Sequence, residues 1–198
     1  MKTKSVMIVG VGGQGSLLAS RILGNVFMAQ GFDVKVSEVH GMSQRGGSVV
    51  TYIKYGDQVF SPIVEQGEAD FLLSFEQLEA ARWLPYLKKE GTMILSTQKI
   101  DPMPVITGTA EYPEDIVTKL RQTGANLVAV DALSLAQQAG SAKATNTVLI
   151  GILSTMMPFA KEHWETAIRE LVPPKFLDLN VNAFELGRAA AVDGAKMK

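Results

Sequence analysis

A glycine-rich segment near the N-terminus has residue types and a spacing that can bind phosphate. Its pattern, G-x-G-x-x-G, comprises Gly10, Gly12, Gly13, Gln14 and Gly15. The first glycine permits a tight turn, the second lets a ligand approach the backbone, and the third lets a helix pack against a strand. N–H groups at the start of the following helix would then form an anion site. Alternatively, these glycines only close a tight strand-to-helix turn and bind no ligand. The pattern alone does not decide between phosphate binding and a purely structural turn.

A second polar segment, with the sequence HGMSQRGG, occupies residues 40–47 after the next apolar run. Arg45 offers five donors in a planar fork, and its neighbours are short, polar or glycine: Ser43, Gln44, Gly46 and Gly47. Both segments follow a strand-like run, and α/β sheets bind ligands at the carboxyl ends of their strands. We therefore expect the two segments to meet there and to form a polar surface, although an ordinary loop remains the alternative.

Other polar residues have simpler interpretations, and no catalytic residue is predicted. Glu38 could accept hydrogen bonds from a ribose diol, whereas His40 has no evident partner for proton transfer. His163 is expected at the surface or in packing, and Asp131 as a helix cap. Glu76 either caps a helix or faces the ligand edge. Met156, Met157 and Phe159 are expected in the core or at a subunit interface.

Composition excludes several classes of function. The chain has 198 residues, 46% of them hydrophobic, and a net charge of -1, whereas nucleic-acid binders normally carry a basic excess. It has 0 Cys, which excludes disulfides, a thiolate nucleophile and a Cys-ligated iron–sulfur cluster. With 2 His, a His-rich metal site is not expected either.

The apolar segments do not have the features of membrane or export signals. The N-terminal run is short and passes directly into the glycine turn, so we expect a cytoplasmic protein. The longest apolar stretch, residues 147–160, is shorter than the roughly 20 residues of a spanning helix. It is predicted to be a buried helix.

The elements that must position these residues alternate along the chain, which is typical of α/β proteins. Strands are predicted at residues 5–9, 33–39, 48–55, 59–60, 70–75, 92–96 and 126–130. Helices are predicted at residues 14–30, 76–88, 113–121, 131–139, 144–157, 161–171 and 179–192. The first strand, helix and next strand suggest a right-handed βαβ unit with parallel strands. We expect one Rossmann-like domain over residues 1–193: a mostly parallel sheet with helices on both faces, an inserted hairpin at residues 48–60, and a C-terminal helical layer. Residues 194–198 are expected to be a frayed tail.

Three functional classes fit these elements. One is a nicotinamide dehydrogenase, which lacks a clear catalytic constellation further along the chain. The second is an adenylyltransferase of the ubiquitin-activating type, because GVGGQGS is similar to that family's turn, although many members use a cysteine that this chain lacks. The third is a non-catalytic subunit that has the fold without the nucleotide.

Taken together, the two polar segments resemble a known family over nearly the whole chain. GVGGQG and EVHGMSQRGGSVVTYIKYG are similar to the gamma-type subunits of 2-oxoacid:ferredoxin oxidoreductases, and the HGMSQRGG form is most similar to the beta subunits of indolepyruvate ferredoxin oxidoreductases. Two further segments agree: DFLLSFE at residues 70–76 and ATNTVLIG at residues 144–151.

The resemblance implies a subunit of a complex that oxidatively decarboxylates aryl pyruvates to acyl-CoA and reduces ferredoxin. Thiamine diphosphate and the iron–sulfur clusters would belong to a larger, Cys-containing alpha subunit, and no cofactor is assigned to this chain. Its partners would be that subunit and, through the complex, ferredoxin and coenzyme A; in isolation it could form a homodimer. The two polar segments would face the alpha subunit or coenzyme A, so Arg45→Ala should weaken the reconstituted complex. The alternatives are a gamma subunit acting on pyruvate, 2-oxoglutarate or ketoisovalerate, or a stand-alone nucleotide-binding protein.

Overall fold

The computed structural model describes residues 2–40 and 46–196, with side chains described up to residue 191. Within these ranges, six strands form one sheet: β1 (Lys4–Val11), β2 (Asp33–His40), β3 (Ser48–Gly56), β4 (Ala69–Ser74), β5 (Leu87–Ser96) and β6 (Asn126–Val130). Their order across the sheet is β2-β3-β1-β4-β5-β6. The pairs β1–β4, β4–β5 and β5–β6 are parallel, and β3 is antiparallel to both of its neighbours. The expected α/β class with a mostly parallel sheet is confirmed.

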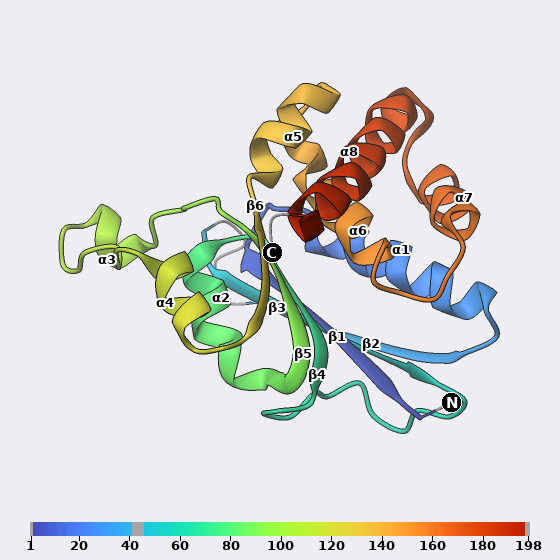
Figure 1. Ribbon diagram of the computed structural model, residues 1–198, viewed down its shortest axis with the longest axis horizontal. Coiled ribbons are helices and arrows are strands. Elements are labelled where there is room, and N and C mark those ends of the chain that lie inside the picture. The colour runs from blue at the N-terminus through green and yellow to red at the C-terminus, as the bar shows by residue number, and fades with distance from the viewer. Residues whose placement is uncertain (1, 41–45, 197–198) are drawn as a thin grey trace.

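Helices cover both faces of this sheet because successive strand side chains point to opposite sides. In β1, Val6 and Ile8 enter one core, whereas Met7 and Val9 enter the other. The first core also contains residues of α1 (Ser16–Ala29), α5 (Ala132–Ala139), α6 (Thr145–Ser154), α7 (Lys161–Leu171) and α8 (Leu177–Lys196). The second contains residues of α2 (Gln77–Trp83) and α4 (Ile116–Gln122). Figure 1 shows these two layers, with α3 (Met103–Ile106) projecting to one side.

The predicted C-terminal helical layer is present, and α6 lies at its centre. All ten residues of α6 are buried, and glycines let it approach α8 closely. A Cβ atom at Gly151 would lie 2.2 Å from the carbonyl oxygen of Phe184, and one at Gly187 would lie 2.0 Å from that of Val148. Met157 belongs to the same core. In the described part of the chain, no helix combines the length and the apolar character needed to cross a membrane.

The inserted hairpin differs from the expected one. Residues 59–60 do not form a return strand; instead, β2 and β3 are the antiparallel pair, connected through residues 41–47. As a result β3 lies between β1 and β2, which run in the same direction but are not neighbours. The alternation of apolar and polar residues correctly predicted a strand at residues 48–55. It could not predict the position of that strand in the sheet, because such periodicity indicates which side chains are buried and not which strands pair.

Several predicted boundaries are also wrong. The helix expected at residues 76–88 ends at Trp83, and after the 3-10 turn Leu84–Tyr86 the chain already enters β5 at Leu87. The helix expected from Pro113 begins instead at Ile116. Helix α3 was not predicted.

Candidate functional site

The glycine turn and Gly47, the last residue of the second polar segment, meet at the carboxyl edge of the sheet. The N–H of Gly12 donates to the carbonyl oxygen of Gly47 at 2.9 Å, which joins the glycine turn to the start of β3. This contact agrees with the expectation that the segments lie together. Gly46 and Gly47 are therefore placed beside the turn, whereas Ser43, Gln44 and Arg45 lie outside the described residues.

Gln14 closes the glycine turn from within. Its Oε1 accepts from the N–H of Val11 at 2.7 Å. Its Nε2 donates to the carbonyl oxygen of Phe75 at 2.9 Å and to Oε1 of Gln98 at 3.2 Å. The N–H of Gln14 itself donates to the carbonyl oxygen of Val11 at 3.2 Å. These bonds show that the turn is held closed by one of its own side chains.

Gly15 links the turn to the C-terminal helical layer. Its φ of 83° lies in the left-handed region, and it directly precedes α1. A Cβ here would lie 2.7 Å from Nδ2 of Asn146, which donates to the carbonyl oxygen of Gly15 at 3.1 Å. Gly15, the last glycine of the pattern, thus permits a close contact with α6. The expectation from the sequence was a close contact between a helix and a strand instead. Asn146 is 2% exposed and was missed as a site residue, although it lies in the ATNTVLIG segment that carried the resemblance.

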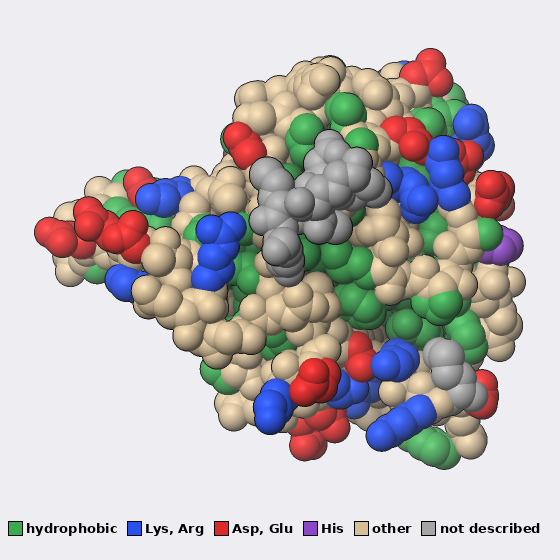
Figure 2. All heavy atoms as spheres, viewed as in Figure 1, with side chains coloured by type: hydrophobic (Ala, Val, Ile, Leu, Met, Phe, Trp, Pro, Cys, Tyr) green, Lys and Arg blue, Asp and Glu red, His purple; other side chains and the backbone are tan. Residues whose placement is uncertain are grey.

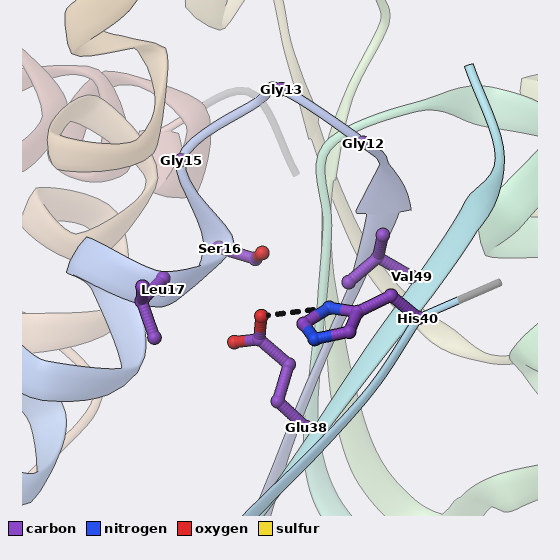
Figure 3. Close-up of a pocket in the computed structure, with 8 residues that line it drawn as sticks. All are labelled: Gly12, Gly13, Gly15, Ser16, Leu17, Glu38, His40 and Val49. Carbon is purple, nitrogen blue, oxygen red and sulfur yellow. Dashed lines mark ion pairs between the residues drawn. The ribbon is translucent and has the colours of Figure 1, made fainter. Parts of the chain in front are cut away.

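A cavity of about 390 Å³ lies between the turn, the start of α1 and the end of β2 (Figure 3). It is lined by Gly12, Gly13, Gly15, Ser16, Leu17, Glu38, His40 and Val49. Nδ1 of His40 lies 3.1 Å from Oε1 of Glu38, so His40 has the partner that sequence reasoning did not find. The second carboxylate oxygen of Glu38 accepts from Thr51 Oγ1 at 3.2 Å. The cavity therefore has an acid–imidazole pair on one wall and the N-terminus of α1 on the other.

The strand order changes what Glu38 can do in this cavity. In a dinucleotide site the acidic residue that binds the ribose follows the strand beside the first one. Here β3 occupies that place, and Glu38 lies on the strand beyond it. The cavity is thus not arranged as a standard dinucleotide site, even though it adjoins the glycine turn.

The chain after Gly47 is anchored to α2 by a buried carboxylate. Glu79 is 4% exposed. Its Oε2 accepts from the Ser48 hydroxyl at 2.5 Å and from the Trp83 indole at 3.2 Å. Arg82 Nε donates to its other oxygen at 3.2 Å. These bonds hold the start of β3 in position next to the turn.

Glu76 has the capping role that was one of its two predicted alternatives. Its Oε2 accepts from the N–H of Glu79 at 2.9 Å. Its Oε1 accepts from the N–H of Ile100 at 3.2 Å and from the hydroxyl of Tyr112. Burial and the hydrogen bond to this carboxylate raise the pKa of Tyr112. Glu76 itself is 1% exposed, so it lies beneath the edge and not on its surface.

The remaining candidates have the simpler roles that were expected of them. Asp131 caps α5 by accepting from the N–H of Ser134 at 3.0 Å, and the Ser134 hydroxyl and N–H lower the pKa of this carboxyl group. His163 is exposed on α7. Among the described residues, no group of three or more His, Cys, Asp or Glu could hold a metal ion.

Comparisons with known proteins identify the family of this chain. A family model described as pyruvate ferredoxin/flavodoxin oxidoreductase matches residues 5–190, and the chain belongs to that family. It is 45% identical over 196 residues to indolepyruvate oxidoreductase subunit IorB of Thermococcus kodakarensis, a match that covers 96% of this chain and 97% of the relative. The resemblance inferred from the two polar segments is confirmed.

More distant relatives show how far the fold extends. The pyruvate/ketoisovalerate oxidoreductases common subunit gamma of Pyrococcus abyssi is 25% identical over 177 residues, covering 88% of this chain and 89% of the relative. The crystal structure of the keto/oxoacid ferredoxin oxidoreductase gamma subunit from Geobacter sulfurreducens has a TM-score of 0.72 and 23% identity, covering 96% of this chain and 99% of that one. The latter similarity shows that the fold is shared.

Proposed function

We propose that this chain is the smaller subunit of a complex that oxidatively decarboxylates indolepyruvate or a similar aryl pyruvate to an acyl-CoA and reduces ferredoxin. The observation that carries this proposal is the 45% identity to an indolepyruvate oxidoreductase subunit along essentially the full length of both chains. Identity to the pyruvate/ketoisovalerate gamma subunit is 25%, which favours the aryl substrate over pyruvate or ketoisovalerate.

The redox groups would lie on a larger alpha subunit. This chain has 0 Cys, so it offers no thiolate for an iron–sulfur cluster. Thiamine diphosphate, when bound on the alpha subunit, would supply the chemistry that breaks the carboxyl–carbonyl bond. We also propose a cytoplasmic location for the complex.

The contribution of this chain would be the polar edge around the glycine turn. Gln14, Asn146 and Glu79 hold that edge with partly buried hydrogen bonds, which favours a surface that keeps one shape. The cavity beside it presents Glu38, His40 and Ser16. We infer that the edge completes the complex by contacting the alpha subunit or coenzyme A. A stand-alone nucleotide-binding protein is the less favoured alternative, because Glu38 does not lie on the strand next to β1, where a dinucleotide site has its ribose-binding acid.

Reconstitution tests the proposed activity. The chain is expressed alone and together with its larger partner, and reduction of ferredoxin is followed with coenzyme A and indolepyruvate, pyruvate or 2-oxoglutarate. We expect activity only from the assembled complex and highest kcat/KM with indolepyruvate. Activity of the isolated chain, or a preference for a small aliphatic oxoacid, would contradict the proposal.

A pair of substitutions tests the polar edge within the same assay. His40→Ala removes a side chain that lines the cavity, whereas His163→Ala changes an exposed histidine on α7. If the edge contacts coenzyme A, His40→Ala should raise the KM for coenzyme A, and if it contacts the alpha subunit it should weaken assembly. Identical kinetics and assembly for both variants would show that the polar edge contacts neither coenzyme A nor the alpha subunit. The proposed activity of the complex would be unaffected by that result.

A further inference from the structure

A pocket of about 150 Å³ lies among α1, α8 and two 3-10 turns, η2 (Ala142–Ala144) and η3 (Pro174–Phe176). The proposed function does not use it. An apolar cavity of about this volume can hold a benzene molecule, so the pocket has room for a body of that size. Five of its eight lining residues are apolar: Leu18, Ser141, Lys143, Val172, Pro173, Phe176, Leu179 and Asn180.

Asn180 forms a fixed wall of this pocket. It is 6% exposed, its Nδ2 donates to the carbonyl oxygen of Phe176 at 2.9 Å, and its Oδ1 accepts from the Thr147 hydroxyl at 2.7 Å. The N–H of Thr147 donates to Oδ1 of Asn146 at 2.8 Å, and Asn146 in turn binds Gly15. Because a satisfied network of buried polar groups is rigid, this wall keeps one shape.

The other two polar lining residues offer hydrogen-bond donors. Ser141 Oγ accepts from the N–H of Lys143 at 3.2 Å, and within the described residues its hydroxyl hydrogen has no acceptor. In the same part of the chain Lys143 is exposed and has no ion-pair partner. A hydroxyl and an ammonium group two residues apart suit a group that only accepts hydrogen bonds, such as a carboxylate.

Charge near the pocket favours an anion as well. The two segments that supply most of the lining carry two lysines, Lys143 and Lys175, against one carboxylate, Asp178. At the end of α7, Arg169 and Glu170 offset each other. Helix α5, which leads to Ser141, has the uncharged sequence ALSLAQQA, and the surface over α5 is largely free of charged side chains in Figure 2. The balance around the pocket is therefore positive.

We propose that this pocket binds a small carboxylate whose apolar body is about the size of a phenyl ring. The apolar body lies against Leu18, Phe176 and Leu179. The Lys143 ammonium and the Ser141 hydroxyl bind the carboxylate at the mouth. An apolar lining with a few polar groups that fix orientation is the usual composition of a small-molecule site. The inference does not depend on the proposed function, because the pocket is separate from the cavity beside the glycine turn.

Titration calorimetry of the full chain tests this site with three matched probes. Phenylacetate has both the ring and the charge, phenylacetamide lacks the charge, and acetate lacks the ring. We expect phenylacetate to bind with a Kd of about 1 mM or lower, and the other two about tenfold more weakly or less tightly still. Absence of saturable phenylacetate binding, or equal affinity for phenylacetamide, would overturn the proposal.

Substitutions assign the binding to this pocket. Lys143→Gln should weaken phenylacetate binding about 3- to 10-fold and leave phenylacetamide binding nearly unchanged. The matched control is Lys119→Gln, which removes the same charge from an exposed position on α4 and should change neither affinity by more than about twofold. Phe176→Ala should weaken both ligands, since its side chain lines the pocket while its carbonyl oxygen still binds Asn180. Equal effects of the two lysine variants would refute the assignment.

Methyl NMR locates the phenyl ring directly. Ring-current shifts should appear at the methyl groups of Leu18 and Leu179, which line the pocket. They should be absent at Leu17, which lines the cavity beside the glycine turn. Shifts at Leu17 without shifts at Leu18 and Leu179 would place phenylacetate at the polar edge and overturn the proposal.

Discussion

Replacing Gln14 with alanine should destabilise the protein by about 2–3 kcal/mol. The side chain makes three hydrogen bonds, at 2.7, 2.9 and 3.2 Å, and each bond contributes roughly 0.5–1.5 kcal/mol net. One of them satisfies the N–H of Val11, a residue only 9% exposed, and an unsatisfied buried donor costs about 1–3 kcal/mol. Water will enter part of the vacated space because Gln14 is half-buried, so the lower part of the summed range is expected.

Urea unfolding followed by circular dichroism measures this loss, with linear extrapolation to water. For a chain of this size, 1 kcal/mol corresponds to about 2–4 °C, so the Tm should fall by about 4–12 °C. Gln138→Ala, on the exposed side of α5, is the matched control and should stay within about 0.5 kcal/mol of the wild type. Gln14→Ala could instead be as stable as the control and lose activity in the reconstituted complex. That result would mean that Gln14 binds a ligand and does not stabilise the turn, which would refute this prediction.

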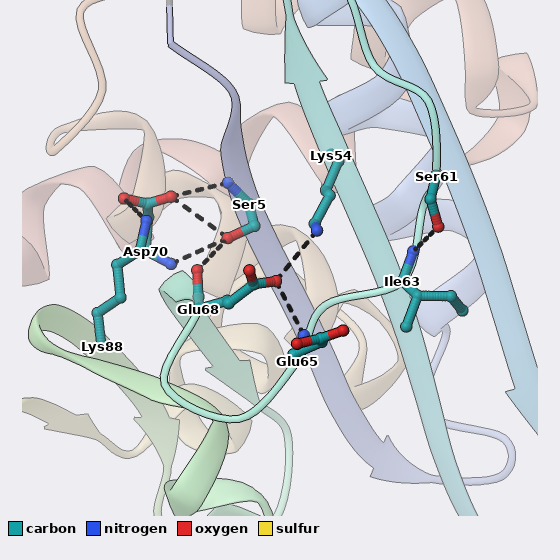
Figure 4. Close-up of polar contacts among 8 residues, drawn as sticks. All are labelled: Ser5, Lys54, Ser61, Ile63, Glu65, Glu68, Asp70 and Lys88. Carbon is teal, nitrogen blue, oxygen red and sulfur yellow. Dashed lines mark hydrogen bonds and ion pairs between the residues drawn. The ribbon is translucent and has the colours of Figure 1, made fainter.

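Two further predictions concern packing and charge. Gly151→Ala should lower the free energy of unfolding by about 1–3 kcal/mol or more, because the added Cβ would lie 2.2 Å from the carbonyl oxygen of Phe184. Gly24→Ala should raise the free energy of unfolding by about 0.5–1 kcal/mol, because a Cβ there would meet no atom outside its own helix backbone within 4 Å. Burial raises the pKa of Asp70, but hydrogen bonds from Lys88 and Ser5 N–H (Figure 4) and from Lys4 outweigh it and hold this pKa below its ordinary 3.8. Its stabilisation is therefore present at neutral pH and is lost as pH falls below about 4 through the folded-state pKa.

Unfolding free energies measured in urea check both predictions. Equal stability of the two glycine variants would contradict the close α6–α8 contact. For Asp70, the comparison is with Asp70→Asn from pH 7 to pH 2: the variant should be less stable than the wild type at neutral pH, and the difference should shrink in acid. A difference that is constant over this range would mean that the lysines do not stabilise the ionised carboxylate.

Local patterns predicted much of the fold because they report burial directly. The run SVMIV has the β-branched, apolar character of a strand buried on both faces, and residues 5–9 do lie in the centre of the sheet. Asp131 was recognised as a cap because capping is a contact between residues three apart in sequence. By contrast, α3 is a single turn of four residues containing Pro104, too short to show a period.

The candidate site was predictable in its location but not in its contacts. Segments that follow strands in an α/β protein lie at one edge, which is why the glycine turn and Gly47 were expected to be neighbours. Which side chains secure that edge could not be read from spacing, because Gln14 binds a residue 61 positions away and Asn146 one 131 positions away. The buried Glu79 was missed for the same reason, since its partner Ser48 lies on a distant strand.

The amino-acid sequence alone establishes the α/β class, the absence of thiolate chemistry in a chain with 0 Cys, and the family to which the two polar segments belong. These follow from residue types and short-range periodicity, which are properties of each segment by itself. Only the folded chain shows the insertion of β3 between β1 and β2, the bond from Gln14 to Phe75, and the bonds that Glu76 accepts from Ile100 and Tyr112. Each depends on hydrogen bonds between segments far apart in sequence, and spacing along the chain does not show which distant segments the fold brings together.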